Sequence, residues 1–393
     1  MIRVVVIGQG QVASNFVVGL ERLKKGEIEP YGVPLADMDL GYNFNDIKIV
    51  GSYDVDAGKV GRSLYDVAKM YFNEEIIPEE LKDIYVRKGI SLGKLQDMPF
   101  DIVSLDENNG SLSDVIDLLY EEWCRLKPDV VVDLTTTQYG IVFRDFKKLE
   151  ETVLKNNREL LTPSQVYCYS LIKYVENVRS AAYVNCIPVP IANDPAIVGK
   201  MMEAGGLVLG DDGATGATPL TADILRHMAD RNRKVLSVAQ FNIGGNLDFL
   251  ALLNKERNRA KEFTKSSIVK DILGYDAPHY IRPTGYLEPL GDKKFVAMHL
   301  IYKSFNGAED EIIVNMRIND SPALAGYVVD LVRLSKLALD NEIYGTVYEI
   351  NAFYMKRPGP LGSKSISKIL ARRLLGEWVG KAARKPVKAY EII

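Results

Sequence analysis

The sequence predicts an α/β protein in which a parallel sheet wrapped by helices is followed by a second region with a sheet of a different kind. Up to about residue 200, short apolar strand candidates alternate with helical segments, which is typical of a parallel sheet covered by helices. Beyond that point, Asn306-Gly307 joins two strand-like runs and predicts an antiparallel hairpin. The 393 residues also exceed the ~250–300 at which a single core stops growing, so we expect more than one domain.

The strand candidates of the first region are rich in β-branched residues, as expected for strands that are buried on both faces. They span residues 2–7, 46–56, 128–137 and 181–195. Helical patterns lie between them, including residues 113–126 and 146–156.

The second region has strand candidates at residues 234–243 and on both sides of the Asn306-Gly307 turn. A long helix is expected over residues 319–341, with Ser321 as its N-cap and Pro322 in its first turn. A basic amphipathic helix is expected from about Ser365.

Composition excludes several functional classes. The net charge of −3, from 49 basic and 52 acidic residues, leaves no basic footprint for nucleic acid. The three cysteines have no metal-ligand spacing, and so sparse a set favours a reducing compartment. No apolar run is long enough to span a bilayer, and the N-terminal residues do not suit a cleavable signal. We expect a cytoplasmic protein without membrane or nucleic-acid partners.

A glycine motif, Gly8-x-Gly10-x-x-Ala13, follows the first strand candidate and precedes a helix. In this context the motif indicates dinucleotide binding on a Rossmann-type sheet, with Gly8 in the tight turn, Gly10 beside the pyrophosphate and Ala13 packed closely. Gln11 and Val12 lie inside the motif and are expected to contact the cofactor too. The alternative is a glycine-rich turn without a ligand, but the position of the motif favours binding.

Asp54 ends the second strand candidate, where an acid binds the adenosine ribose and favours NAD over NADP. Its distance from Gly10 is longer than the usual ~20 residues, and Asp56 competes for the same role. Thr135, at the end of a later strand candidate, is a further expected cofactor contact.

Two glycine-containing loops have less specific meanings. The stretch "GDDGATGATP" at residues 210–219 could hold a metal, orient a lysine or bind phosphate through its amides. It could also be a flexible loop in which Thr218 caps the next helix. The stretch "NIGGNLDFL" at residues 242–250 is by itself only a turn.

Lys261 and Lys265 lie four positions apart, so a helix would direct both from one face. That face is either solvated or holds an anion between the two ammonium groups. Taken singly, Lys294 and Lys356 are most often surface residues, and Asp320 would stabilise the start of the long helix.

Together these stretches resemble the myo-inositol-1-phosphate synthase family in its shorter prokaryotic form. The matching stretches, in the order and approximate spacing of the family, are "GQGQVAS", "DVDAGKVG", "CIPVPIANDP", "GDD", "NIGGNLDFL", "KEFTKS", "GDKKFVAM", "NDSPALAG" and "FYMKRP". One departure is the loop "GDDGATGAT", which is shorter than the family pattern "GDDxKSG" and lacks its lysine and serine.

The resemblance implies a Rossmann-type doubly wound parallel sheet interrupted by an α+β domain for catalysis and oligomerisation. The implied divisions are an NAD-binding domain at residues 1–200, the α+β domain at 201–320, and helices at 321–393 that return to the first domain. A homotetramer is the implied assembly.

The resemblance also implies the site residues. Its active-site lysines and acids correspond to Lys261, Lys265, Lys294, Lys356, Asp320 and Asp212. Asp211 is the alternative second acid and an expected cofactor contact. The expected substrate-binding residues are Asn242, Gly244, Gly245, Asn246, Ser266 and Ser267, with the two serines and the two glycine amides as phosphate donors.

The implied activity converts glucose 6-phosphate to 1L-myo-inositol 1-phosphate, the step that leads to inositol. Catalytic NAD supports oxidation at C5, enolisation, an intramolecular aldol closure and re-reduction. Lysines suit this chemistry because each step places negative charge on oxygen. Which lysine moves the C5 hydroxyl proton stays open, with Lys261 favoured. The resemblance leaves open whether a divalent or monovalent cation takes part.

Two other functions remain as alternatives. The chain could be a simple NAD-dependent dehydrogenase of a phosphorylated or acidic small molecule, although four lysines are more than hydride transfer requires. It could also be a non-catalytic NAD-binding homologue, for which the shortened loop is the only support.

Overall fold

The computed structural model describes residues 1–107 and 110–382, without the side chains of residues 260 and 263–266. Its first sheet has six parallel strands in the order β3-β2-β1-β4-β5-β6. The strands are β1 (Ile2–Ile7), β2 (Ile47–Asp54), β3 (Val86–Lys88), β4 (Val130–Asp133), β5 (Ala182–Asn185) and β6 (Leu207–Leu209). This order reverses direction between β1 and β4, so the expected doubly wound parallel sheet is confirmed.

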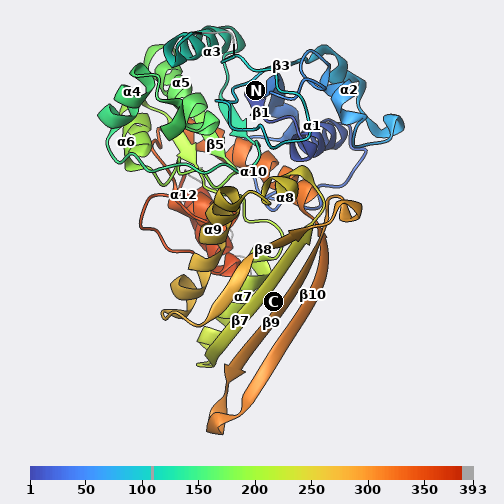
Figure 1. Ribbon diagram of the computed structural model, residues 1–393, viewed down its shortest axis with the longest axis vertical. Coiled ribbons are helices and arrows are strands. Elements are labelled where there is room, and N and C mark those ends of the chain that lie inside the picture. The colour runs from blue at the N-terminus through green and yellow to red at the C-terminus, as the bar shows by residue number, and fades with distance from the viewer. Residues whose placement is uncertain (108–109, 383–393) are drawn as a thin grey trace.

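Helices cover both faces of this sheet (Figure 1). On one face pack α1 (Gln11–Lys24), α2 (Leu64–Ala68), α10 (Asp320–Asp340), α11 (Tyr348–Tyr354) and α12 (Lys368–Ala382). On the other pack α3 (Leu112–Leu126), α4 (Phe146–Leu154), α5 (Pro163–Asn177) and α6 (Pro195–Ala204). Strand β1 shows why its sequence is apolar throughout: Val4 and Val6 belong to the first core, while Val5 and Ile7 belong to the second.

The second sheet has the order β10-β9-β7-β8 and extends away from the helix-wrapped sheet (Figure 1). Its strands are β7 (Lys234–Gly244), β8 (His279–Tyr286), β9 (Lys293–Lys303) and β10 (Glu309–Asn319). The hairpin between β9 and β10 turns at Asn306, whose φ is 57°, as the Asn-Gly pair predicts. The expectation of an antiparallel sheet is only partly right, because β7 and β8 run parallel.

One face of the second sheet packs against α7 (Thr218–Asp230) and α9 (Lys255–Leu273) through a smaller apolar core. The short helix α8 (Leu247–Ala251) follows β7 directly. Single-turn 3₁₀ helices lie at Phe44–Asp46, Glu74–Ile76, Glu79–Asp83, Arg158–Leu160, Glu288–Leu290 and Phe305–Gly307. Within the described ranges, no helix is both long enough and apolar enough to cross a membrane.

Three local expectations differ from the structure. The parallel sheet continues to Leu209, past the expected boundary at residue 200. The N-cap of α10 is Asn319 rather than Ser321. Ser321 lies inside the helix, and its amide and hydroxyl both donate to Asp292. Thr218 does not cap α7; it is the first helical residue, after Ala217.

The unusually long gap between Gly10 and Asp54 is explained by a loop that packs on α10. The amide of Leu35 donates to Asp330 at 2.8 Å, and Arg333 donates to the carbonyl of Leu35 at 3.0 Å. The loop approaches so closely that a Cβ at Gly326 would lie 2.2 Å from the carbonyl oxygen of Gly32. The loop therefore belongs to the core rather than to the cofactor site.

This close approach predicts a contrast between two helical glycines. Gly326→Ala should lower the free energy of unfolding by about 1–3 kcal/mol, because the added methyl overlaps backbone. Gly19→Ala in α1, where a Cβ meets nothing within 4 Å, should instead raise it by roughly 0.5–1 kcal/mol. Denaturant unfolding of both variants measures the difference, and equal effects would contradict the packing of the loop on α10.

Candidate active site

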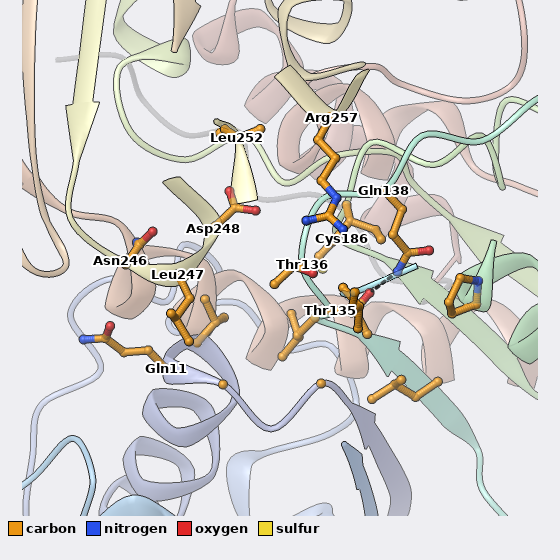
Figure 2. A pocket seen from close by; sticks show the side chains of 18 of the residues that line it. Gln11, Thr135, Thr136, Gln138, Cys186, Asn246, Leu247, Asp248, Leu252 and Arg257 are labelled. Atoms are coloured by element: carbon orange, nitrogen blue, oxygen red, sulfur yellow. Dashed lines mark hydrogen bonds between the residues drawn. The ribbon is translucent and has the colours of Figure 1, made fainter. Parts of the chain in front are cut away.

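The carboxyl ends of β1 and β4 open into a cavity between the two sheets. Its volume is about 560 Å³. Ligands of doubly wound sheets bind at this position, where the strand order reverses. Figure 2 shows Asp248 of α8, Gln11 at the start of α1 and Thr135 in the loop after β4 among the side chains that line the cavity.

The Gly8–Ala13 turn has the geometry of a dinucleotide site. Gly8 has a φ of 84°, and a Cβ there would lie 2.7 Å from the amide nitrogen of Thr135, so only glycine fits. A Cβ at Gly10 would meet nothing within 4 Å, so a ligand can approach its backbone. Gln11 and Val12 line the cavity, and Ala13 is fully buried behind them. Helix α1 lacks a side-chain cap, which leaves its first turn suited to a pyrophosphate.

The two candidate ribose acids differ in position. Asp54 lines the cavity; its Oδ1 accepts from the amides of Val55 and Asp56, and its Oδ2 lies 3.6 Å from Lys59 Nζ. Asp56 is not among the lining residues, and its carboxylate instead binds the amide of Gly58 and the ammonium of Lys59. The geometry therefore favours Asp54 over Asp56.

Thr135 also lines the cavity, although its own polar groups are partly engaged. Its amide donates to Asp133 Oδ1 at 3.0 Å and its hydroxyl to the same oxygen at 2.7 Å. The hydroxyl oxygen in turn accepts from Gln138, as Figure 2 shows. Asp133 thus fixes the loop that faces Gly8.

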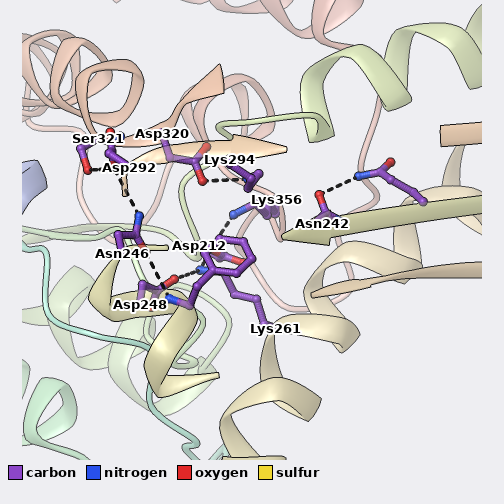
Figure 3. A network of polar contacts seen from close by, with 12 residues as sticks. Asp212, Asn242, Asn246, Asp248, Lys261, Asp292, Lys294, Asp320, Ser321 and Lys356 are labelled. Carbon is purple, nitrogen blue, oxygen red and sulfur yellow. Dashed lines mark hydrogen bonds and ion pairs between the residues drawn. The ribbon is translucent and has the colours of Figure 1, made fainter. Parts of the chain in front are cut away.

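At the far end of the cavity, two lysines share the carboxylate of Asp212 (Figure 3). Lys261 Nζ lies 3.0 Å and Lys356 Nζ 2.9 Å from the same oxygen, Oδ1. Asp212 is fully buried, and its φ of 64° places its backbone in the left-handed region. The lysines come from α9 and from the segment after α11, so the shared carboxylate joins distant parts of the chain.

The pKa values of the two lysines are shifted in opposite directions. Burial lowers the pKa of Lys356 to about 8; Asp212 opposes this effect, and the charges of Lys261 and Lys294 add to it. Burial also acts on Lys261, but the carboxylates of Asp212 and Asp248 outweigh it and raise the pKa of that lysine. Near neutrality Lys261 therefore stays charged, whereas Lys356 can lose its proton.

A second ion pair lines the same cavity. Lys294 Nζ lies 2.7 Å from Asp320 Oδ2, while Asp320 Oδ1 is buried without a hydrogen-bond partner among the residues that the structure describes. Gly216, with a φ of 68°, passes so close that a Cβ there would lie 2.4 Å from Lys294 Nζ. The shortened loop therefore packs directly against this pair.

Asp211, an expected cofactor contact, does not line the cavity. It is almost fully buried outside the cavity lining, and its carboxylate accepts from the backbone amides of residues 191–193 and from the side chains of Asn185 and Asn193. Burial raises its pKa to about 6 despite these bonds. Asp211 is thus an internal acceptor that fixes the loop from which Asp212 projects.

Several expected substrate contacts also lie elsewhere. Asn242 is buried in the second sheet, where it donates to the carbonyl of Arg282. The amide of Gly245 donates to the carbonyl of Gly291 and is not directed at a ligand. A Cβ at Gly244 would lie 2.4 Å from the ring of Phe249, which gives that glycine a packing role.

Of the remaining expected contacts, Asn246 lines the cavity, donates to Asp292 and caps α8. Ser267 is not a lining residue. The side chains of Lys265 and Ser266 lie outside the described part of the structure.

Sequence reasoning missed Asp248. Its Oδ1 accepts from the amide and the hydroxyl of Thr137, and its Oδ2 lies 3.7 Å from Lys261 Nζ. It links the loop after β4 to the second region. Its position in the stretch "NIGGNLDFL", which matches the family, was the signal that could have identified it. Arg257, one helical turn before Lys261, was missed too; it lines the cavity and donates to the carbonyl of Lys94 at 2.6 Å.

A metal site receives no support from side-chain grouping. Across residues 1–107 and 110–382, no three His, Cys, Asp or Glu side chains are placed so that they could hold a metal ion together. The acids near the lysines are instead paired with ammonium groups.

Comparison with known proteins identifies the family. A model for myo-inositol-1-phosphate synthase matches residues 216–321, which include Lys261, Lys294 and Asp320. The chain is 55% identical to a myo-inositol-1-phosphate synthase-related protein of Thermotoga maritima, with a TM-score of 0.93, over 97% of this chain and 98% of that one. The chain belongs to the myo-inositol-1-phosphate synthase family.

More distant members of the myo-inositol-1-phosphate synthase family agree with this assignment. The inositol-3-phosphate synthase of Mycobacterium tuberculosis H37Rv is 28% identical over 365 residues, which are 91% of each chain. The inositol-3-phosphate synthase of Caenorhabditis elegans is 18% identical, with a TM-score of 0.82 over 100% of this chain and 88% of that one, a likeness that shows the fold. The prokaryotic form expected from the sequence is confirmed.

Asp211 and Asp212 are neighbours in the loop, but replacing each of them by asparagine should have a different effect. Asp212→Asn should lower the pKa values of both Lys261 and Lys356, because the carboxylate that favours their charged forms is lost. Competitive labelling with acetic anhydride across a pH series, read by peptide mass spectrometry, measures both values.

Asp211→Asn is the matched control. It should change both lysine pKa values much less, because Asp211 is not among the charges that act on them. It should instead cost roughly 1–3 kcal/mol of the free energy of unfolding, because an amide cannot accept all the hydrogen bonds of the carboxylate. Unchanged lysine pKa values in Asp212→Asn would contradict the assignment of the shared carboxylate.

Proposed function

We propose that the protein converts glucose 6-phosphate to 1L-myo-inositol 1-phosphate without net redox change. The observation that carries this proposal is one cavity that joins a dinucleotide-binding turn at Gly8 to three buried or half-buried lysines. A dehydrogenase needs the first feature, but a cluster of Lys261, Lys294 and Lys356 suits a reaction that repeatedly places negative charge on oxygen. Family membership supports the same substrate class, a sugar phosphate.

The residues of the dinucleotide end fit NAD. The dinucleotide, when bound, supplies the hydride acceptor for oxidation at C5 and the hydride donor for the final reduction. The Gly8–Ala13 turn would hold its pyrophosphate, and Asp54 would accept from its ribose hydroxyls. Because a carboxylate repels a 2′-phosphate, Asp54 favours NAD over NADP.

At the lysine end, Lys356 is better suited than Lys261 to accept the proton of the C5 hydroxyl. Its lowered pKa of about 8 makes its neutral amine available near neutrality. Lys261, whose pKa is raised, remains a cation that stabilises the enolate and the alkoxide formed on ring closure. The sequence-based preference for Lys261 as the base is therefore replaced by Lys356.

The second ion pair has a complementary role. Lys294 would bind substrate oxygens as a fixed positive charge, while the unpartnered Oδ1 of Asp320 would accept a hydrogen bond from a substrate hydroxyl. Lys265, which the family pattern adds to the site, would supply a further cation.

A homotetramer is part of the proposal, and the exposed face of the second sheet supports it. Phe241 and Tyr280, whose ring centroids lie 5.5 Å apart, are exposed on neighbouring strands. Ile313 on β10 is 64% exposed. Exposed apolar residues on an open sheet suit burial against another copy of the chain.

The deciding experiment incubates the protein with glucose 6-phosphate and a small amount of NAD⁺. The expected product is acid-stable, periodate-sensitive phosphate in large excess over NAD⁺, with no lasting rise in NADH absorbance. Stoichiometric NADH would show a simple dehydrogenase instead. NAD⁺ binding without conversion of the sugar phosphate would show a non-catalytic homologue.

The role of Lys356 predicts the pH dependence of turnover. Only the neutral amine accepts a proton, so kcat/KM should rise about tenfold per pH unit below the pKa of about 8 and level off above it. Lys356→Met should lower kcat roughly 10²–10⁴-fold and abolish this limb. Lys364→Met, which removes an exposed lysine nearby, should keep both the rate and the limb. A limb that survives in Lys356→Met would assign the proton transfer to another group.

A further inference from the structure

Lys368 is a buried lysine that the proposed chemistry does not use. Its side chain is 7% exposed and does not line the cavity. Its Nζ donates to the carbonyl oxygens of Ala352 at 2.6 Å and Met355 at 2.9 Å. Burying an ammonium group costs free energy. The two hydrogen bonds to carbonyl oxygens are contacts that an apolar residue could not make.

The carbonyls that Lys368 binds lie at the end of α11, immediately before Lys356. The last carbonyls of a helix lack intrahelical partners, and a lysine can satisfy them. Met355 is the residue that follows α11, and Lys356 comes next in the chain. Lys368 therefore fixes the backbone from which the side chain of Lys356 extends.

The backbone of Lys356 is held from two sides. Its amide donates to the carbonyl of Asp212 at 2.6 Å, the same residue whose carboxylate binds its ammonium (Figure 3). Its carbonyl accepts from the hydroxyl of Ser365 at 2.9 Å. Ser365 and Lys368 thus add to the contacts by which Asp212 holds this part of the backbone.

Residues 365–368, which we name the anchor segment, are themselves fixed to two helices. The amide of Ser365 donates to Asp271 of α9 at 2.9 Å, and the amide of Lys368 donates to Asp223 of α7 at 2.7 Å. Because α9 also carries Lys261, the anchor segment ties the two lysines that share Asp212 to one framework.

We propose that Lys368 is a positioning residue for Lys356, holding the end of α11 so that the Lys356 amine meets both Asp212 and the substrate. The proposal rests on the proposed function, in which Lys356 moves the proton. Proton transfer requires placement within hydrogen-bond reach, and a shift of about 1 Å can cost on the order of 10²-fold in rate.

The contact of Lys356 with Asp212 gives this role an electrostatic signature. Burial lowers the pKa of Lys368 to about 7, Asp223 opposes this effect, and the charge of Lys356 adds to it. Lys356 itself faces Asp212, Lys261 and Lys294. Since Asp212 raises the pKa of Lys356, a Lys356 amine that moves away from Asp212 when Lys368 is removed should have a lower pKa.

The test compares Lys368→Met with Lys364→Met, which removes an exposed lysine just before the anchor segment. Lys368→Met should bind NAD⁺ with an unchanged dissociation constant, lose roughly tenfold or more in kcat, and shift the pH limb downward. Lys368→Arg, which keeps the charge and the donors, should retain more activity than the methionine variant. Lys364→Met should match the parent in all three measurements.

Competitive labelling of Lys356 with acetic anhydride reports its pKa without turnover. If the parent protein does not convert glucose 6-phosphate, a lowered Lys356 pKa in Lys368→Met would leave the positioning of Lys356 by Lys368 standing and remove its catalytic role. Parental kcat and parental pKa would overturn the proposal. If Lys368→Met does not fold by circular dichroism, Lys368→Gln replaces it, and failure of both to fold would make Lys368 purely structural and overturn the positioning role.

Discussion

A buried carboxylate shared by two ammonium groups is the interaction on which the rest of the site depends. One negative charge cannot fully satisfy two positive ones in a region of low dielectric, so the pair around Asp212 is electrostatically unbalanced. The imbalance falls on Lys356, which has two other cations nearby, whereas Lys261 has Asp248 as a second acid. Two identical side chains thereby acquire different proton affinities through their surroundings alone.

The imbalance persists only if the acids around the two lysines keep their positions. Contacts from several elements fix these acids. Asp211 fixes the loop through the amides of residues 191–193, so that Asp212 can take its unusual backbone conformation. Thr137 fixes Asp248 from the parallel sheet. The catalytic arrangement is therefore built from contacts between the two sheets, and neither sheet contains it alone.

The sequence was most informative where function depends on local pattern. The Gly8–Ala13 turn, the Asn306-Gly307 hairpin and the both-face burial of β1 follow from neighbouring residues, and each was predictable. Asp211 and Asp212 could not be told apart, because their partners, the amides of residues 191–193 for Asp211 and two lysines for Asp212, are all distant in sequence. Asp248 was missed because its importance comes from Thr137 and Lys261, both far away in sequence. The packing of Gly245 could not be predicted, because its closest neighbours, at residues 287–291, are not revealed by the motif.

The path of the chain between the two sheets determines which parts of the second region can change in sequence without altering the candidate site. The chain leaves the parallel sheet just before Asp212 and returns to its helical cover at Asp320, where α10 begins, so both crossings coincide with acids of the candidate site. Lys294 pairs with Ile318 near the same end of the β9–β10 hairpin, while Asn306 lies at the opposite end. Residues can thus be added to or removed from that distal tip across homologues without disturbing the lysines, whereas a change of one residue at either crossing alters the site directly.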